Sequence, residues 1–66
     1  MPTWTRISWR MAAIDHLTSM GYDSFPATAI VDDYIDRFDY HPDPVPFTDN
    51  EPSAVMDRWM GGARFS

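Results

Sequence analysis

Apolar residues recur with helical spacing through the first third of the chain. They fall into two adjoining rows, Trp4, Ile7, Met11 and Ile14, and Trp9, Ala13, His16 and Met20. This pattern predicts a helix over about residues 5–20, ended by Gly21, which tolerates the left-handed backbone found at many helix ends. So broad an apolar girdle indicates either the central helix of a domain or a helix that offers an apolar face to a partner.

The clearest pattern lies between residues 26 and 39. Its apolar positions recur at i, i+1, i+4, i+5 and i+8, namely Ile30, Val31, Tyr34, Ile35 and Phe38. Pro26 suits the first turn of a helix, where the missing N–H has no partner to lose. These residues predict a second helix over 26–39 whose outer side is acidic.

A stiff connection and a third helix follow. Prolines at the alternate positions 42, 44 and 46 remove hydrogen-bond donors and favour extended backbone, so residues 40–50 are predicted to form a Pro-rich connection. A third helix is expected over 51–60, with Gly61-Gly62 as its stop. Strand patterns are nearly absent. The predicted fold is therefore all-α, a single small domain over 1–66 built as a three-helix bundle.

Length and composition limit what such a domain can do. The 66 residues include no cysteine, ten acids and five cations, all of them arginine, for a net charge of −5. A chain of this length buries only about 60% of its surface, which excludes a multi-step enzyme with its own cofactor fold. The longest apolar run, residues 11–14, is far shorter than the roughly twenty residues that cross a bilayer. We expect a cytoplasmic protein without a membrane span, a compartment with which the absence of cysteine is compatible.

The charges are placed unevenly along the chain. Residues 23–57 hold nine acids and a single cation, Arg37, which gives this segment a net charge of −8. Such a segment repels phosphate backbones, so direct binding to nucleic acid or to an anionic membrane is disfavoured and a basic protein partner is favoured. A helix-turn-helix drawn over residues 12–38 fails for the same reason, because its recognition helix would present aspartates to the DNA.

Residues with catalytic or metal-binding chemistry are few. The run from Asp32 to Asp36 matches Asp-Asp-x-x-Asp, a spacing that holds Mg²⁺ in prenyl-transferring enzymes, but a chain this short cannot enclose their large apolar cavity. His16 directly follows Asp15, and adjacent residues of a helix do not face each other, while His41 lies beside a proline. No serine has a base within local reach, and no glycine-rich phosphate loop is present. We expect no catalytic residue, no metal site and no cofactor.

Two short stretches carry a partial resemblance to a known family. They are Ile14-x-x-Leu17-x-x-Met20-Gly21-Tyr22 followed by Ala27 and Val31, and Ala54-Val55 followed by Trp59-Met60. The first resembles the first helix, the Met-Gly-aromatic loop and the start of the second helix of ubiquitin-associated domains, and the second is similar to their third helix. That family consists of three-helix bundles that bind an apolar patch on ubiquitin. The resemblance thus implies a binding surface at Met20, Gly21, Tyr22, Trp59 and Met60, although the family joins its second and third helices by a short loop.

The acidic side of the second helix is the strongest indication of function in the sequence. Asp33 has Arg37 one helical turn away, whereas Asp32, Asp36 and Asp39 have no cation at that spacing. Their charges follow the helix axis at about one per 5 Å, more sparsely than phosphates along a DNA strand. Nearby aromatic residues, including Phe47, are of the kind that anchors interfaces. The predicted partner-binding residues are Asp32, Asp33, Asp36, Asp39, Asp43, Tyr34, Tyr40 and Trp59.

These features predict a small acidic protein-protein interaction module that docks on a basic site of a larger protein, including a site that binds nucleic acid. In size and charge it resembles phage-type inhibitors, among them anti-CRISPR proteins and DNA mimics, with which it shares no motif. One alternative is a structural or adaptor subunit that binds through the apolar face of the first helix, and another is ubiquitin-like recognition. Ionic strength distinguishes docking through the acids from docking through the apolar face of the first helix. Only docking through the acids weakens as the salt concentration rises.

Overall fold

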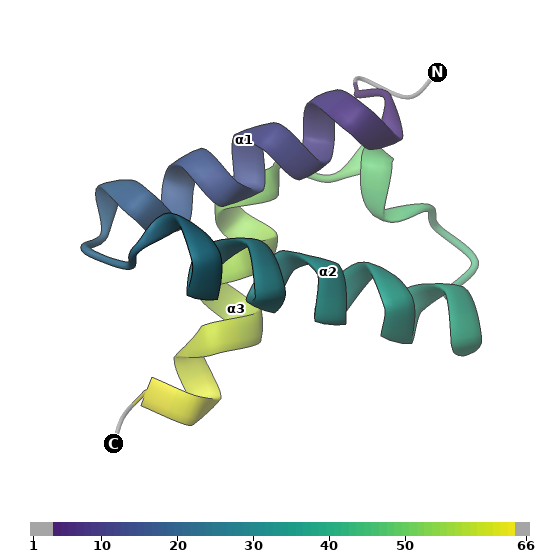
Figure 1. Ribbon diagram of the computed structural model, residues 1–66. Helices are drawn as coiled ribbons and strands as arrows, with labels where there is room; N and C mark the ends of the chain where they lie inside the picture. Colours follow the sequence, from purple (N-terminus) through teal and green to yellow (C-terminus); the bar gives the residue numbers. More distant parts are fainter. Residues whose placement is uncertain (1–3, 65–66) are drawn as a thin grey trace.

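Residues 4–64 of the computed structural model contain three α-helices and no strand, and side chains are described for residues 4–60 (Figure 1). The elements are α1 (Arg6–Ser19), α2 (Ser24–Tyr40), a short 3-10 helix η1 (Phe47–Asp49) and α3 (Pro52–Arg64). This arrangement confirms the predicted all-α, three-helix fold. The single domain predicted over 1–66 includes both chain ends, which lie outside the described residues.

Two helix boundaries differ from the prediction. α2 begins at Ser24, so Pro26 occupies its third position, where the N–H of any residue would still have no acceptor within the helix. α3 continues through Gly61-Gly62, the expected stop, and ends at Arg64. Each glycine lowers helix propensity by about 1 kcal/mol relative to alanine, but glycine can still adopt helical backbone.

The end of α1 confirms the role predicted for Gly21. This residue has φ of +106°, and its N–H donates to the Thr18 carbonyl oxygen at 3.1 Å. The next N–H, that of Tyr22, donates to the Leu17 carbonyl oxygen at 3.2 Å. The two bonds form a Schellman motif, which satisfies carbonyl groups that the last helical turn leaves without partners. The chain therefore turns sharply after α1.

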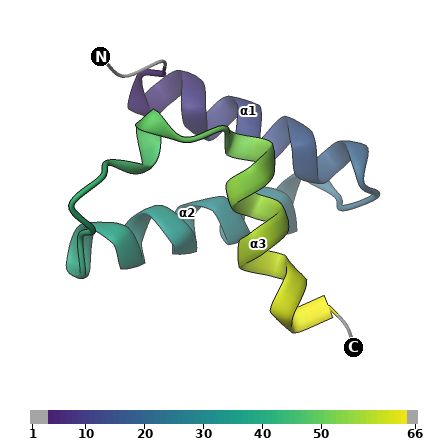
Figure 2. The ribbon, with the colours of Figure 1, turned by 180° about the vertical axis from the view of Figure 1, so that it is seen from behind.

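That turn sends α2 back alongside α1, so the two helices run in opposite directions (Figure 1). α3 crosses the pair on one side, and the view from behind shows it in front of both helices (Figure 2). Between α2 and α3, the Pro-rich connection loops outward and η1 brings the chain back towards α1. Within the described residues, the opposite side of the α1–α2 pair has no helix over it.

The core lies between this helix pair and α3. Its buried apolar side chains come from all four elements and are Trp9, Ala13, Leu17, Ala27, Val31, Phe47, Val55 and Met56. The Trp9 indole N–H donates to the Asn50 carbonyl oxygen at 3.0 Å, which satisfies the only polar atom of that side chain. Phe47 is only 2% exposed, whereas the sequence suggested a surface anchor, because η1 turns its ring into the core.

Candidate docking surface

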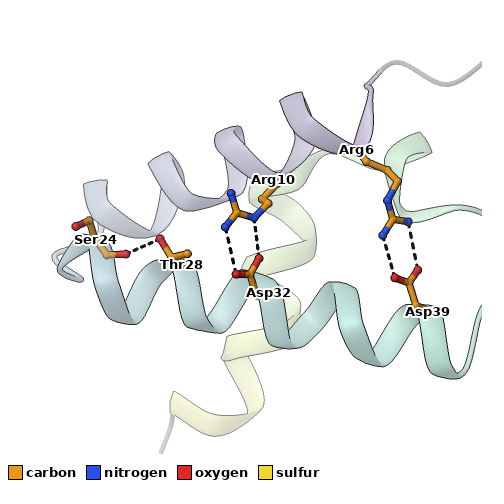
Figure 3. A network of polar contacts seen from close by, with 6 residues as sticks. All are labelled: Arg6, Arg10, Ser24, Thr28, Asp32 and Asp39. Atoms are coloured by element: carbon orange, nitrogen blue, oxygen red, sulfur yellow. Dashed lines mark hydrogen bonds and ion pairs between the residues drawn. The ribbon is translucent and has the colours of Figure 1, made fainter.

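Two of the predicted binding acids are paired with arginines of α1 (Figure 3). Arg10 binds Asp32 through two hydrogen bonds, from Nε to Oδ1 at 2.7 Å and from Nη2 to Oδ2 at 3.2 Å. Arg6 binds Asp39 in the same two-pronged way, at 2.9 and 3.2 Å. Neither acid has a cation one turn away in its own helix, as the sequence indicated, but the antiparallel packing of α1 supplies one to each.

These pairs reduce the negative field along the α1–α2 seam. The hydrogen bond from Arg10 holds the pKa of the Asp32 carboxyl below its usual range, with burial opposing that shift and the charge of Arg10 adding to it. The side chains of both pairs stay about half exposed, so each pair contributes little to stability. Their principal effect is to hold the two helices in one register and to occupy two carboxylates that a partner would otherwise meet.

Asp33 and Asp36 lie elsewhere on the same helix. Both side chains are exposed, and neither takes part in an ion pair or side-chain hydrogen bond among the residues with described side chains. The pairing of Asp33 with Arg37 that the sequence allows is absent there. The guanidinium carbon of Arg37 instead lies 5.4 Å from the centre of the Trp59 ring on α3. Arg37 therefore packs on Trp59 and pairs with neither of the two acids.

Five exposed positions follow one another along the side of α2 that faces away from the core. They recur at i, i+4, i+8, i+11 and i+15, and we call them the outer face of α2: Phe25, Ala29, Asp33, Asp36 and Tyr40. The two aromatic residues at its ends are 83% and 82% exposed, more than any other large apolar side chain in the described part of the chain. The outer face spans about 22 Å at 1.5 Å per residue. It thus combines an acidic centre with an aromatic residue at each end.

The other predicted aromatic anchors belong to the core. The Tyr34 ring stacks on Trp9 at 5.7 Å between centroids and meets Trp59 edge to face at 5.2 Å. Phe47 joins this group through edge contacts with Trp9 at 4.7 Å and with Phe38 at 5.1 Å. Burial raises the pKa of the Tyr34 hydroxyl, and the negative charge of Asp43 raises it further. Tyr34 and Trp59 are half-buried, so neither offers a fully exposed ring.

Tyr40 and Asp43 mark the transition from α2 to the Pro-rich connection. The Tyr40 ring makes an edge contact with His41 at 5.0 Å, and every residue from 41 to 46 is exposed. The sequence analysis identified Tyr40 but missed Phe25, at the opposite end of the same row. The signal was present, because positions 25, 33, 36 and 40 share one helical face once α2 is extended back to residue 24.

The remaining ionisable groups within residues 4–60 include one contact between a histidine and a carboxylate but no cluster suited to a metal ion. No three histidine, aspartate or glutamate side chains in this part of the chain lie close enough to hold a metal ion. The Nε2 atom of His16 on α1 lies 2.9 Å from Oδ1 of Asp57 on α3, so this histidine links two helices at the edge of the core. No helix of the described chain has the length and apolar character needed to cross a membrane.

The residues of the ubiquitin-associated resemblance lie at the α1–α2 turn and on α3. Met20 and Gly21 are exposed, whereas Tyr22, Trp59 and Met60 are half-buried and pack against the core. Comparison of the chain with models of known protein families, with curated proteins and with solved structures gives no match. The surface of the molecule itself is therefore the guide to its function.

Proposed function

We propose that this protein is a non-catalytic interaction module that docks, through the outer face of α2, on a basic surface of a larger protein. One observation carries the proposal. Phe25 and Tyr40, the two most exposed large apolar side chains described, stand at the ends of a row whose centre holds Asp33 and Asp36, and neither acid is ion-paired among residues 4–60.

The two kinds of residue have complementary roles in docking. Exposed aromatic rings are the side chains that most often supply binding energy when a partner covers them. Carboxylates beside them steer a basic partner towards the face and reject an acidic one. The chain itself shows how arginine meets its aromatic rings, since Arg6 lies 5.2 Å from the Phe47 ring centre and Arg37 lies over Trp59. A partner rich in arginine fits this surface best.

The ion pairs with α1 change the form that this function takes. Four free carboxylates along α2 would imitate, at wider spacing, the phosphates of a DNA strand. Arg6 and Arg10 pair with two of the four. Asp33 and Asp36 remain, about 4.5 Å apart along the axis and confined to one helical turn. The proposal is therefore aromatic-anchored docking and not imitation of a long phosphate row. Seated on a basic cytoplasmic site that holds nucleic acid, the protein would act as a phage-type or anti-CRISPR inhibitor does, by excluding that nucleic acid.

The test is affinity purification of the partner from the native host, followed by binding measurements with the purified pair. Phe25→Ser and Tyr40→Ser are each expected to weaken binding by about tenfold. The double variant Asp33→Asn, Asp36→Asn should slow association and flatten its dependence on salt. Where the partner binds nucleic acid, the protein should displace a labelled oligonucleotide from it.

A charge-matched control separates local docking from general acidity. The double variant Asp49→Asn, Glu51→Gln removes the same charge at exposed positions outside α2. We expect it to bind like the parent protein at moderate salt. If the control loses as much affinity as the Asp33, Asp36 variant, or if both serine variants bind normally, the outer face is not the docking surface.

A further inference from the structure

A second row of side chains follows α1 beside the buried row of that helix. We call it the α1 stripe: Ile7, Met11, Ile14 and Thr18. Its first two members are exposed, its last two are half-buried, and Ile14 packs against the edge of the core. Ile7 is 74% exposed and Met11 is 63% exposed, although both are apolar. The sequence suggested one apolar girdle around this helix, but the structure divides it. Trp9, Ala13 and Leu17 are buried, whereas the N-terminal half of the stripe, Ile7 and Met11, is exposed.

The spacing of the stripe is the spacing of helix-helix packing. Its members recur at intervals of four, three and four residues, which matches alternating d and a positions of a heptad. The stripe thus has the spacing of a seam that normally faces a second helix. Its Ile7 and Met11 side chains are largely exposed to solvent.

A shallow hollow lies on the stripe, lined by Met11, Ile14, Asp15 and Thr18, with Ala12 at its margin. The first four residues stand at i, i+3, i+4 and i+7, the set that forms the hole receiving one knob from a facing helix. The small side chain of Ala12 leaves room at the margin. The carboxylate of Asp15 gives this otherwise apolar hollow one acidic side.

We infer that the α1 stripe binds an amphipathic helix of a partner protein, which inserts a bulky apolar side chain into the hollow and carries cations along its flank. The hole geometry argues for a helix, and the acid at the rim argues for a basic flank facing Asp15. A second copy of the chain is a poorer occupant, because each copy carries a net charge of −5 and the copies repel each other. This surface is distinct from the outer face of α2, and the inference stands without that function.

The probe is a synthetic helical peptide of about three heptads with leucine at a and d and lysine at e and g. Titrated into isotope-labelled protein, it should shift the amide signals of Ile7, Met11, Ile14 and Thr18, with saturable binding. A peptide of the same composition in scrambled order tests for simple charge attraction, and one with glutamate at e and g tests the basic flank. Both control peptides are expected to bind at least about tenfold more weakly than the leucine-lysine peptide.

Two variants tie the binding to the stripe. Ile7→Ser and Met11→Ser change exposed side chains, so each should melt like the parent while binding the leucine-lysine peptide about tenfold more weakly. The double variant Asp33→Asn, Asp36→Asn should bind this peptide like the parent. That variant separates failure of this inference from failure of the proposed function.

Several results would overturn the inference. If the scrambled peptide binds equally well, the binding is only charge attraction. If both serine variants bind the leucine-lysine peptide normally, the stripe is not its binding site. Signals that move only on α2 would assign the peptide to the other surface. Concentration-dependent dimerisation that Met11→Ser abolishes would make a second copy the occupant.

Discussion

At the scale of single residues, the partner of each aspartate decides what that aspartate can do. Asp32 and Asp39 on α2 differ little from Asp36 in sequence context, yet two of the three meet an arginine of α1 and the third does not. Their roles depend on how α1 and α2 are aligned, which no pattern within one helix specifies. The same principle applies to Tyr34, which the sequence placed both on the apolar face of its helix and at the partner-binding surface, and whose ring packs among aromatic neighbours.

Tyr34 leads to a prediction about alkaline stability. Burial raises the pKa of its hydroxyl above the usual tyrosine value of 10.0 in the folded protein, so the folded state holds this proton more tightly than the unfolded state does. The resulting stability is fully present below about pH 10 and is lost as pH rises towards the folded pKa. Tyr34→Phe removes the ionisable group and should make the free energy of unfolding fall less steeply above pH 10.

Urea unfolding at neutral and alkaline pH measures this effect. The Tyr34 hydroxyl has no hydrogen bond among the described side chains, so at pH 7 the variant should match the parent to within about 0.5 kcal/mol. Parallel decline of the two proteins above pH 10 would show that Tyr34 ionises equally easily in the folded and unfolded states.

At the scale of elements, much of the fold follows from periodicity in the sequence. The apolar positions of α2 predicted from spacing of 3.6 residues are the ones that face the core, with Val31 buried and Tyr34 and Phe38 packed against it. Gly21 was identified from its place after α1 because few residues tolerate its positive φ. The candidate docking surface was only partly predictable. Acids and Tyr40 appear in the pattern, but which acids remain unpaired depends on contacts between helices.

The start of α1 provides a prediction at this scale. The Ser8 N–H donates to Thr5 Oγ1 and the Thr5 N–H donates to Ser8 Oγ, each at 3.0 Å, forming a capping box. Thr5→Ala removes the acceptor for the first bond and should reduce the free energy of unfolding by about 1 kcal/mol. Chemical denaturation followed by circular dichroism gives the value.

Thr28→Ala is the matched control for this change. The Thr28 hydroxyl donates to the Ser24 carbonyl oxygen at 2.7 Å within α2, where the backbone needs no such help (Figure 3). Its loss should change stability by less than about 0.5 kcal/mol, because alanine is the better helix former. Equal destabilisation by the two variants would mean that the capping hydrogen bond of α1 adds no more stability than the hydroxyl bond of a threonine within a helix.

At the scale of the whole molecule, a very small core must hold three helices together. A chain of this length has a total stability of about 3–10 kcal/mol, and the core includes only eight buried apolar side chains among the described residues. Phe47 occupies a central place because its ring contacts Trp9 on α1 and both Tyr34 and Phe38 on α2. The Pro-rich connection that delivers Phe47 is therefore part of what keeps the helices assembled.

Phe47→Ala should consequently destabilise the entire protein and not merely release the connection. Truncating a buried phenylalanine costs about 3–5 kcal/mol, a large part of the total stability of so small a domain. Val45→Ala, two residues earlier in the same connection, alters a side chain that is 54% exposed and should leave the melting temperature nearly unchanged. Melting followed in parallel by circular dichroism, for helix content, and by tryptophan fluorescence, for the core around Trp9, should give coincident transitions in both variants, shifted to much lower temperature only in Phe47→Ala. If helix content persists well above the temperature at which the fluorescence changes, α1 and α2 hold together without the core contact, and the connection is only a tether.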